Sequence, residues 1–347
     1  MIALAEGFKE LGHKIIGNCN YWWQPEEQQF LINEDIDGDY DIAIYCRRYV
    51  LSFEHLLFRP GYPNINFNKI NILNDRNDFI SPIWLNPHYS IFDLILAGSM
   101  VEGLKVPSNV RPWAIGLTKR IVNSIDQFYN ENEKIEPIMG CNFTTEHNLR
   151  KFVNENISKL ATKFPYKAKF TSAPDNSNSI DSHYYKTTTR RHVPEYFKSL
   201  NECLMFSAFC GYMEYLPKLY QPYNVLDKIW RKPHALLNDI SSDKSKHQFV
   251  FQYDSFRTWE TFYARTCPLN LDFETWGFIL PEMPKNGIHY LGMNRFDFKN
   301  FVDRIEAMKT EEILSIGIAG RKWVAEHYSP KAQALRLLNY LKDSKKM

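Results

Sequence analysis

The sequence predicts an α/β protein of two domains, each built on a parallel sheet. The chain has 347 residues, too many for one domain of ordinary size and sufficient for two. Short apolar runs alternate with segments whose apolar residues recur every three or four positions, as strands alternate with helices in such proteins. This alternation stops once, at a polar segment, and then restarts.

The first predicted domain, residues 1–122, begins with a helix. Leu4, Phe8 and Leu11 lie on one helical face, and Gly12 follows where the helix would end. His13–Ile16 is expected to form a short buried strand. Further strands are expected at 41–46, 70–73 and 94–98.

The start of the chain departs from the usual pattern of a Rossmann-like half, in which a strand and a Gly-rich turn precede the first helix. We therefore expect the native protein to carry about ten to twenty further residues at this end. The alternative is a diverged half whose first helix simply covers the sheet. Direct pairing of His13–Ile16 with Asp41–Cys46 would exclude a missing strand.

The polar segment 123–134 is expected to link the two domains. The second domain, residues 135–318, restarts with a strand at 135–139. A helix follows, in which Leu149 and Val153 lie on one face. Further strands are expected at 203–209, 249–251 and 268–271, and further helices at 193–202, 259–264 and 298–308.

The last segment, residues 319–347, is expected to be helical and to pack back toward the first domain. Ser329 is a suitable N-cap, and Pro330 suits the first helical position. Two parallel sheets that face each other leave a central cleft, and ligands bind at the carboxyl ends of such strands.

Composition excludes several functional classes. The net charge of +2, without a basic run, gives no attraction to nucleic acid. The six cysteines form no Cys-x-x-Cys pair, so we expect no zinc site and a reduced, cytoplasmic protein. The acidic residues of 35–39 suit a turn, so no metal is expected. Neither a phosphate-binding Gly-x-x-x-x-Gly-Lys loop nor a Gly-x-Gly-x-x-Gly motif occurs.

The segment 254–260, Asp-Ser-Phe-Arg-Thr-Trp-Glu, contains the densest group of candidate ligand-binding side chains. Asp254 or Ser255 can cap a helix, on which Arg257 and Glu260 share a face. A carboxylate in the first turns of such a helix can accept hydrogen bonds from a ribose diol. A guanidinium can bind a diphosphate through two nitrogens. The alternative is a helix-surface Glu260 paired with Arg257.

Residues 259–268, from Trp-Glu to Cys-Pro, resemble the donor-binding segment of GT-B glycosyltransferases. With Leu280-Pro281 and His289-Tyr290 added, the pattern is similar to a group of bacterial family-1-like glycosyltransferases. The resemblance covers residues 185–345 well and the first half in outline. It implies a GT-B fold, two Rossmann-like domains facing a cleft, whose second domain binds a nucleotide diphosphate sugar as co-substrate. Gln252 stands where many retaining members have glutamate, which leaves the stereochemical outcome open.

Two further groups are candidates for donor binding. Arg190, Arg191 and His192 precede a helix N-terminus, where two guanidiniums suit a diphosphate; a basic surface loop is the alternative. His289 and Tyr290 follow a turn and could contact the donor, or they could be hydrogen-bonded core residues.

Together with this resemblance, the sequence implies a metal-independent glycosyltransferase in surface polysaccharide or glycoconjugate synthesis. It would move a sugar from a nucleotide diphosphate sugar, without a further cofactor, to a glycan or lipid-linked acceptor. A lipid-linked acceptor would favour peripheral association with the inner membrane face. The alternatives are a non-catalytic carbohydrate-binding or scaffolding protein on the same fold and, less favoured, a sugar-nucleotide epimerase.

Overall fold

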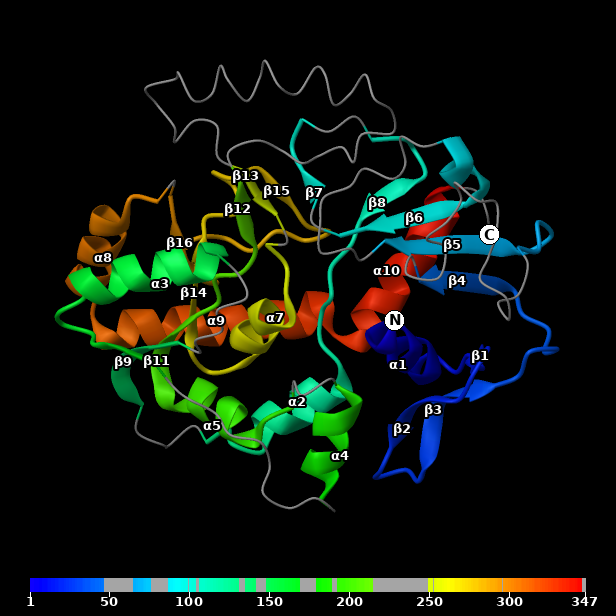
Figure 1. Cartoon of the computed structure of the whole chain (residues 1–347), viewed down its shortest axis with the longest axis horizontal. Coiled ribbons are helices and arrows are strands. Elements are labelled where there is room, and N and C mark those ends of the chain that lie inside the picture. Colours follow the sequence, from blue (N-terminus) through cyan, green and yellow to red (C-terminus); the bar gives the residue numbers. More distant parts are fainter. Residues whose placement is uncertain are drawn as a thin grey trace.

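The protein contains two parallel sheets, each flanked by helices, as the sequence predicts (Figure 1). A computed structural model describes residues 1–46, 65–75, 87–98, 100–103, 106–130, 135–141, 148–168, 179–188, 192–214, 249–251, 253–294 and 296–344. Everything below concerns these ranges. Gln252, Arg190 and Arg191 lie outside them.

The first unit is a four-stranded parallel sheet in the order β4-β5-β6-β8. Its strands are β4 (Ile42–Cys46), β5 (Ile70–Asp75), β6 (Leu94–Ala97) and β8 (Val110–Pro112). Helix α1 (Ile2–Glu10) covers one face, where Leu4 and Phe8 share an apolar cluster with Ile72 and Leu96. A second apolar cluster contains Leu73 and Ile95 together with residues of the 3-10 helix η4 (Pro87–Ile91).

The second unit is a five-stranded parallel sheet in the order β10-β9-β11-β14-β16. Its strands are β9 (Glu136–Cys141), β10 (Tyr166–Ala168), β11 (Cys203–Ser207), β14 (Cys267–Leu271) and β16 (Leu291–Met293). Its helices are α2 (Lys119–Asp126), α3 (Asn148–Leu160), α4 (Ile180–Thr187), α5 (Pro194–Glu202), α7 (Phe256–Tyr263) and α8 (Phe298–Ala307). Helix α2 occupies the start of the segment predicted as a linker. The predicted parallel α/β architecture is confirmed in both halves.

Two antiparallel pairs accompany the second sheet. Strand β12 (Tyr212–Glu214) pairs with β13 (Phe249–Phe251). Strand β7 (Met100–Val101) of the first unit pairs with β15 (Phe278–Ile279) of the second. The Tyr253 hydroxyl reinforces this contact, because it lies 2.7 Å from the Met100 carbonyl oxygen.

The predicted strand His13–Ile16 is wrong for most of its length. Only Ile16 belongs to a strand, β1 (Ile16–Gly17), which pairs with β3 (Gln29–Glu34) and not with β4. The preceding residues make other contacts: the His13 ring packs edge-on against Phe8, and Lys14 forms an ion pair with Asp35. Strand β2 (Tyr21–Gln24) completes this separate three-stranded sheet.

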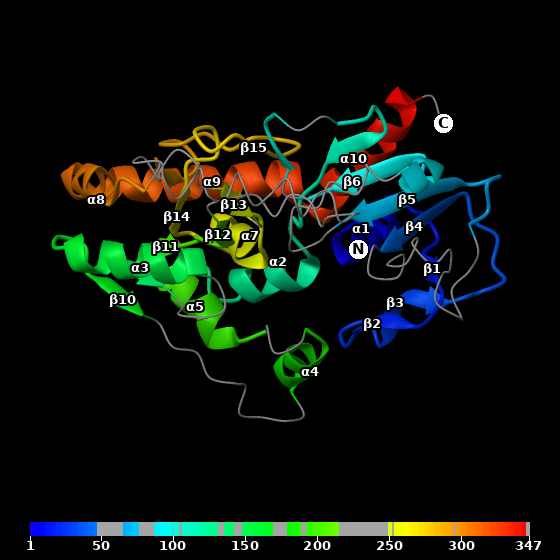
Figure 2. The same ribbon diagram turned by 45° about the horizontal axis from the view of Figure 1, so that its top comes forward.

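The chain returns to the first unit through two consecutive helices, α9 (Thr310–Tyr328) and α10 (Pro330–Asp343). The predicted boundary at 318/319 falls inside α9, whose buried residues on both sides belong to the second-unit core. Helix α10 instead packs against α1 (Figure 2). The two backbones approach closely at Gly7, where a Cβ atom would lie only 2.0 Å from the Pro330 carbonyl oxygen. Ser329 caps α10 by accepting a hydrogen bond from Ala332 N, as predicted.

Glu6 is a buried carboxyl group on α1 that faces the start of α2. Its side chain is 1% exposed, and Oε2 accepts a hydrogen bond from Lys119 N at 2.8 Å. Burial raises the pKa of Glu6 from 4.5 to about 7, although the bond to Lys119 opposes this shift. The folded protein therefore holds this proton more tightly than the unfolded chain does.

We expect Glu6→Gln to change how stability depends on pH. In the parent, the carboxyl group costs stability as pH rises from 4.5 to about 7, and the cost is complete above that range. Glutamine does not ionise, so the variant should exceed the parent by up to about 3 kcal/mol at pH 8 and by much less at pH 5. Urea unfolding at both pH values measures this. The exposed Glu34→Gln is the control, and parallel pH profiles for Glu6→Gln and the parent would contradict the prediction.

Candidate functional site

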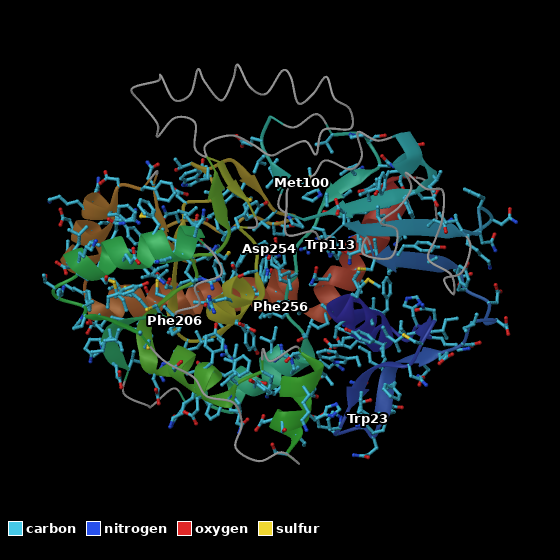
Figure 3. All side chains as sticks on the ribbon, viewed as in Figure 1. Trp23, Met100, Trp113, Phe206, Asp254 and Phe256 are labelled. Carbon is cyan, nitrogen blue, oxygen red and sulfur yellow. The ribbon has the colours of Figure 1, made fainter. Side chains whose placement is uncertain are left out.

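A cavity of about 360 Å³ lies where the two units meet. Asn74 at the end of β5 and Trp113 just after β8 bring the carboxyl ends of the first sheet to its wall. Figure 3 shows Trp113, Asp254 and Phe256 gathered at this junction. The cavity is lined by Met1, Ile2, Ala3, Leu4, Tyr21, Trp22, Asn74, Trp113, Ala114, Ile115, Thr118, Arg120, Thr187, Thr188, Phe256, Glu260 and Gln333.

Glu260 lines this cavity from α7. Ser255 is the N-cap of the helix, and its backbone N–H donates to Thr258 Oγ1. Trp259 and Phe262 are fully buried in the second-unit core, which fixes the rotation of the helix. Glu260 is consequently held at the cavity wall with only 6% of its surface exposed.

Among the described residues of the cavity wall, Arg120 on α2 carries the positively charged side chain. Its guanidinium is largely buried, which lowers its pKa, while the nearby Glu260 charge raises it. Arginine remains protonated in proteins, so the guanidinium keeps its charge. The Arg120 Nη1 atom lies 2.9 Å from His192 Nδ1. Arg120 was not among the residues predicted from the sequence, because it lies ahead of the polar segment 123–134 and belongs to no ligand-binding motif.

His192 connects Arg120 to α4. Because a guanidinium can only donate, His192 Nδ1 must accept from Arg120, and Nε2 then carries the proton and donates to Asp181 Oδ1 at 2.8 Å. Burial lowers the pKa of His192, the bond to Asp181 opposes this, and the Arg120 charge lowers it further. A neutral imidazole therefore orients the guanidinium.

Arg257 lies on α7 but is not part of the cavity wall. Its guanidinium carbon is 6.0 Å from the centre of the Tyr196 ring. Its charge also reaches Cys141 at the end of β9, where burial raises the thiol pKa to about 11 and Arg257 opposes the shift. Arg257 Nε and Nη1 are buried and have no hydrogen-bond partner among the described residues. Arg257 thus lies beside the carboxyl ends of the second sheet.

Asp254 ties the two units together. Its Oδ2 accepts a hydrogen bond from Ile115 N at 3.1 Å, and its Oδ1 accepts one from the Trp259 indole N–H. The side chain is only 2% exposed. Both contacts are structural, and Asp254 is not among the residues that line the cavity.

His289 and Tyr290 lie away from the cavity, against the second-unit core. The His289 ring stacks on Trp323 at 5.5 Å, and its Nδ1 accepts from Lys285 N. Burial lowers the pKa of His289, and the Lys285 charge adds to this. The Tyr290 hydroxyl accepts a hydrogen bond from Phe273 N at 2.9 Å. Tyr290 is 1% exposed and matches the core-residue alternative, whereas His289 is only partly buried; neither residue lines the cavity.

The β2–β3 hairpin supplies two cavity residues that the sequence analysis missed, Tyr21 and Trp22. The available signal was the aromatic run Tyr21–Trp23. Trp22 has φ +63°, a left-handed conformation that a bulky residue adopts at a cost of about 1–3 kcal/mol. Such strain is found where the surrounding structure holds a side chain in a required position.

Comparison with known proteins gives likenesses of fold at low identity. No protein-family model and no curated protein matches the sequence. A variant of TarM from S. aureus, in complex with fondaparinux, alpha-GlcNAc-glycerol and UDP, aligns with TM-score 0.44 and 8% identity over 79% of this chain. HepE from Anabaena, in complex with UDP and glucose, aligns with TM-score 0.42 and 7% identity over 79% of this chain. The alignments cover 51% of the TarM chain and 72% of the HepE chain, so this chain spans about half the length of TarM.

A metal-binding cluster and a membrane-spanning helix are both absent from the described ranges. In those ranges, no three His, Cys, Asp or Glu side chains are grouped so as to hold a metal ion. No helix there is long and apolar enough to cross a bilayer.

We expect Asp254→Ala to lower the free energy of unfolding by about 2–4 kcal/mol, because Ile115 N and the Trp259 indole would both lose a buried charged acceptor. Urea unfolding measures this. The control is Asp297→Ala, which removes an exposed N-cap carboxylate on α8 and should cost about 1 kcal/mol. Unchanged stability combined with weaker nucleotide binding would instead favour the donor contact predicted from the sequence.

Proposed function

We propose that the protein is a glycosyltransferase that uses a nucleotide diphosphate sugar and binds it in the cavity between the two units. The observation that carries this proposal is the convergence of Glu260 and Arg120 on one wall of that cavity. A buried carboxylate suits a ribose diol, and a buried guanidinium suits a diphosphate. The resemblance of residues 259–268 to GT-B donor-binding segments independently assigns the donor role to Glu260.

In this mechanism the protein stabilises the leaving diphosphate by electrostatics. Arg120 neutralises the charge that develops on the leaving group, and His192 and Asp181 keep its guanidinium oriented before the reaction begins. Arg190 and Arg191 would add positive charge, as the sequence analysis proposes. No metal ion is required by this scheme. The acceptor would be a glycan or a lipid-linked acceptor, and the protein would act in the cytoplasm or at the inner membrane face.

Calorimetry of the full chain against UDP, GDP, ADP, CDP and dTDP tests the proposal directly. Binding of one or more of them supports it, and the absence of binding to all of them would reject it. The runner-up function is non-catalytic carbohydrate binding on the same fold, for which Gln252 is the motivation. Hydrolysis or transfer of the bound donor sugar would exclude that alternative.

We expect Glu260→Gln to weaken binding of the preferred nucleoside diphosphate about ten- to hundredfold, because a charged acceptor for the ribose hydroxyls is lost. The melting temperature should stay close to that of the parent. The control ligand is the 2′,3′-dideoxy analogue of the same nucleotide, which the parent and the variant should bind with equal affinity. If the variant loses stability and keeps its nucleotide affinity, Glu260 has a structural role only.

We expect Arg120→Met to weaken nucleoside diphosphate binding at least about tenfold and binding of the matching nucleoside much less, because only the diphosphate contacts the guanidinium. Lys119→Met removes a neighbouring, more exposed cation and should have little effect. The double change Arg190→Ala and Arg191→Ala, in the same assay, shows whether these residues share the diphosphate. Equal losses for nucleoside and diphosphate would remove the assignment of Arg120.

A further inference from the structure

The β2–β3 hairpin belongs to neither parallel sheet, yet it forms part of the cavity wall. It contributes Tyr21, which is 48% exposed, and Trp22, whose backbone is left-handed. The two rings are 6.3 Å apart between centroids. A large, partly exposed aromatic surface therefore borders the same cavity that Glu260 and Arg120 line from the second unit.

The hairpin is fixed at both sides. The Tyr184 hydroxyl on α4 donates to Glu26 Oε2 at 3.0 Å, and the Tyr184 ring lies 6.3 Å from Trp22. On the other side, Lys9 Nζ on α1 lies 2.8 Å from Glu27 Oε2. Figures 1 and 2 both place the hairpin beside α4. The aromatic surface is thus held between elements of the two units.

Two polar groups on the α4 side of the same cavity, Thr187 and Thr188, can act as hydrogen-bond acceptors. Thr187 Oγ1 donates its proton to the His183 carbonyl, and Thr188 Oγ1 donates to the Tyr184 carbonyl. Both threonines line the cavity, and with their protons used inside α4 their hydroxyl oxygens can still accept. A ligand that matches this wall has an apolar face for the aromatic rings and several hydroxyl donors at its edge.

We propose that Tyr21 and Trp22 form a stacking platform for a sugar ring of the acceptor. A pyranose has a C–H face that packs on an aromatic ring and a rim of hydroxyls that donate to threonine oxygens. The inference rests on the proposed function, because the nucleotide occupies Glu260 and Arg120 and leaves the hairpin side to the acceptor. The left-handed Trp22 backbone costs conformational energy, which the fold spends to hold this side chain at the cavity.

Saturation-transfer NMR of the full chain with methyl glycosides of glucose, galactose, mannose and N-acetylglucosamine tests the platform. Trp22→Asn removes the ring and tolerates the left-handed backbone. Tyr21→Ala removes the exposed ring without altering a strained position. The matched control is Gln28→Asn, which changes another left-handed residue of the same hairpin, at its exposed turn. Nucleoside diphosphate binding is measured by calorimetry on the same samples.

At least one glycoside is expected to bind, with saturation transferred to its ring C–H protons. Trp22→Asn and Tyr21→Ala should weaken that binding about tenfold or more, with nucleotide affinity within about twofold of the parent and Gln28→Asn unchanged. Glycoside binding that depends on Trp22 without any nucleotide binding supports the platform and rejects the proposed transferase. The platform is overturned if no glycoside binds, if both variants keep their glycoside affinity, or if Trp22→Asn weakens nucleotide binding equally.

Discussion

The rest of the structure depends on how the chain is clamped where it crosses from the first sheet to the second unit. Asp254 accepts from Ile115 N, Gln333 donates to the Ile115 carbonyl, and Leu117 N donates to the Tyr328 carbonyl. Buried backbone groups need such partners, since an unpaired one costs as much as a lost hydrogen bond. The three contacts come from the residue before the N-cap of α7, from α9 and from α10, so the crossing holds the two units in one relative position.

The same contacts explain why residue 116 is glycine. Gly116 has φ +66°, and a Cβ there would lie 2.0 Å from Gln333 Nε2. Only glycine combines this backbone conformation with so close an approach. Because Ile115 and Gln333 both line the cavity, the shape of the candidate site and the joint between the units are set by the same few side chains.

The electrostatics of the cavity follow from burial. Arg120 and Glu260 are both largely removed from water, and the Glu260 charge favours the charged form of Arg120. His192 is neutral and adds orientation without adding charge. Glu6 lies nearby with its pKa raised to about 7, so the charge balance around Arg120 changes near neutral pH. Such a cavity combines opposite charges at fixed positions, which suits a ligand with separate diol and anionic groups.

Elements with a strong local pattern could be predicted from the sequence. The helix α3 and the cap of α10 depend on residues close together in the chain, and the structure contains both. Glu260 was selected as a candidate donor-binding residue because the sequence around it resembles a known donor-binding segment. The hairpin at Tyr21 was missed, since its pairing with Ile32 depends on a turn without a clear turn motif. The His13–Ile16 run was misplaced because short apolar runs do not specify a partner strand.

The sequence by itself determined the alternation of strands and helices and the division into two parallel sheets, and its resemblance to a known donor-binding segment made Glu260 a candidate. Periodicity and capping act over a few residues, and one chain contains that information in full. Only the tertiary structure decided that Arg120 lines the same cavity as Glu260 and that Asp254 hydrogen-bonds the segment joining the two units. It also decided that His289 and Tyr290 lie outside that cavity. These contacts join residues far apart in the chain, and their positions depend on how buried helices pack.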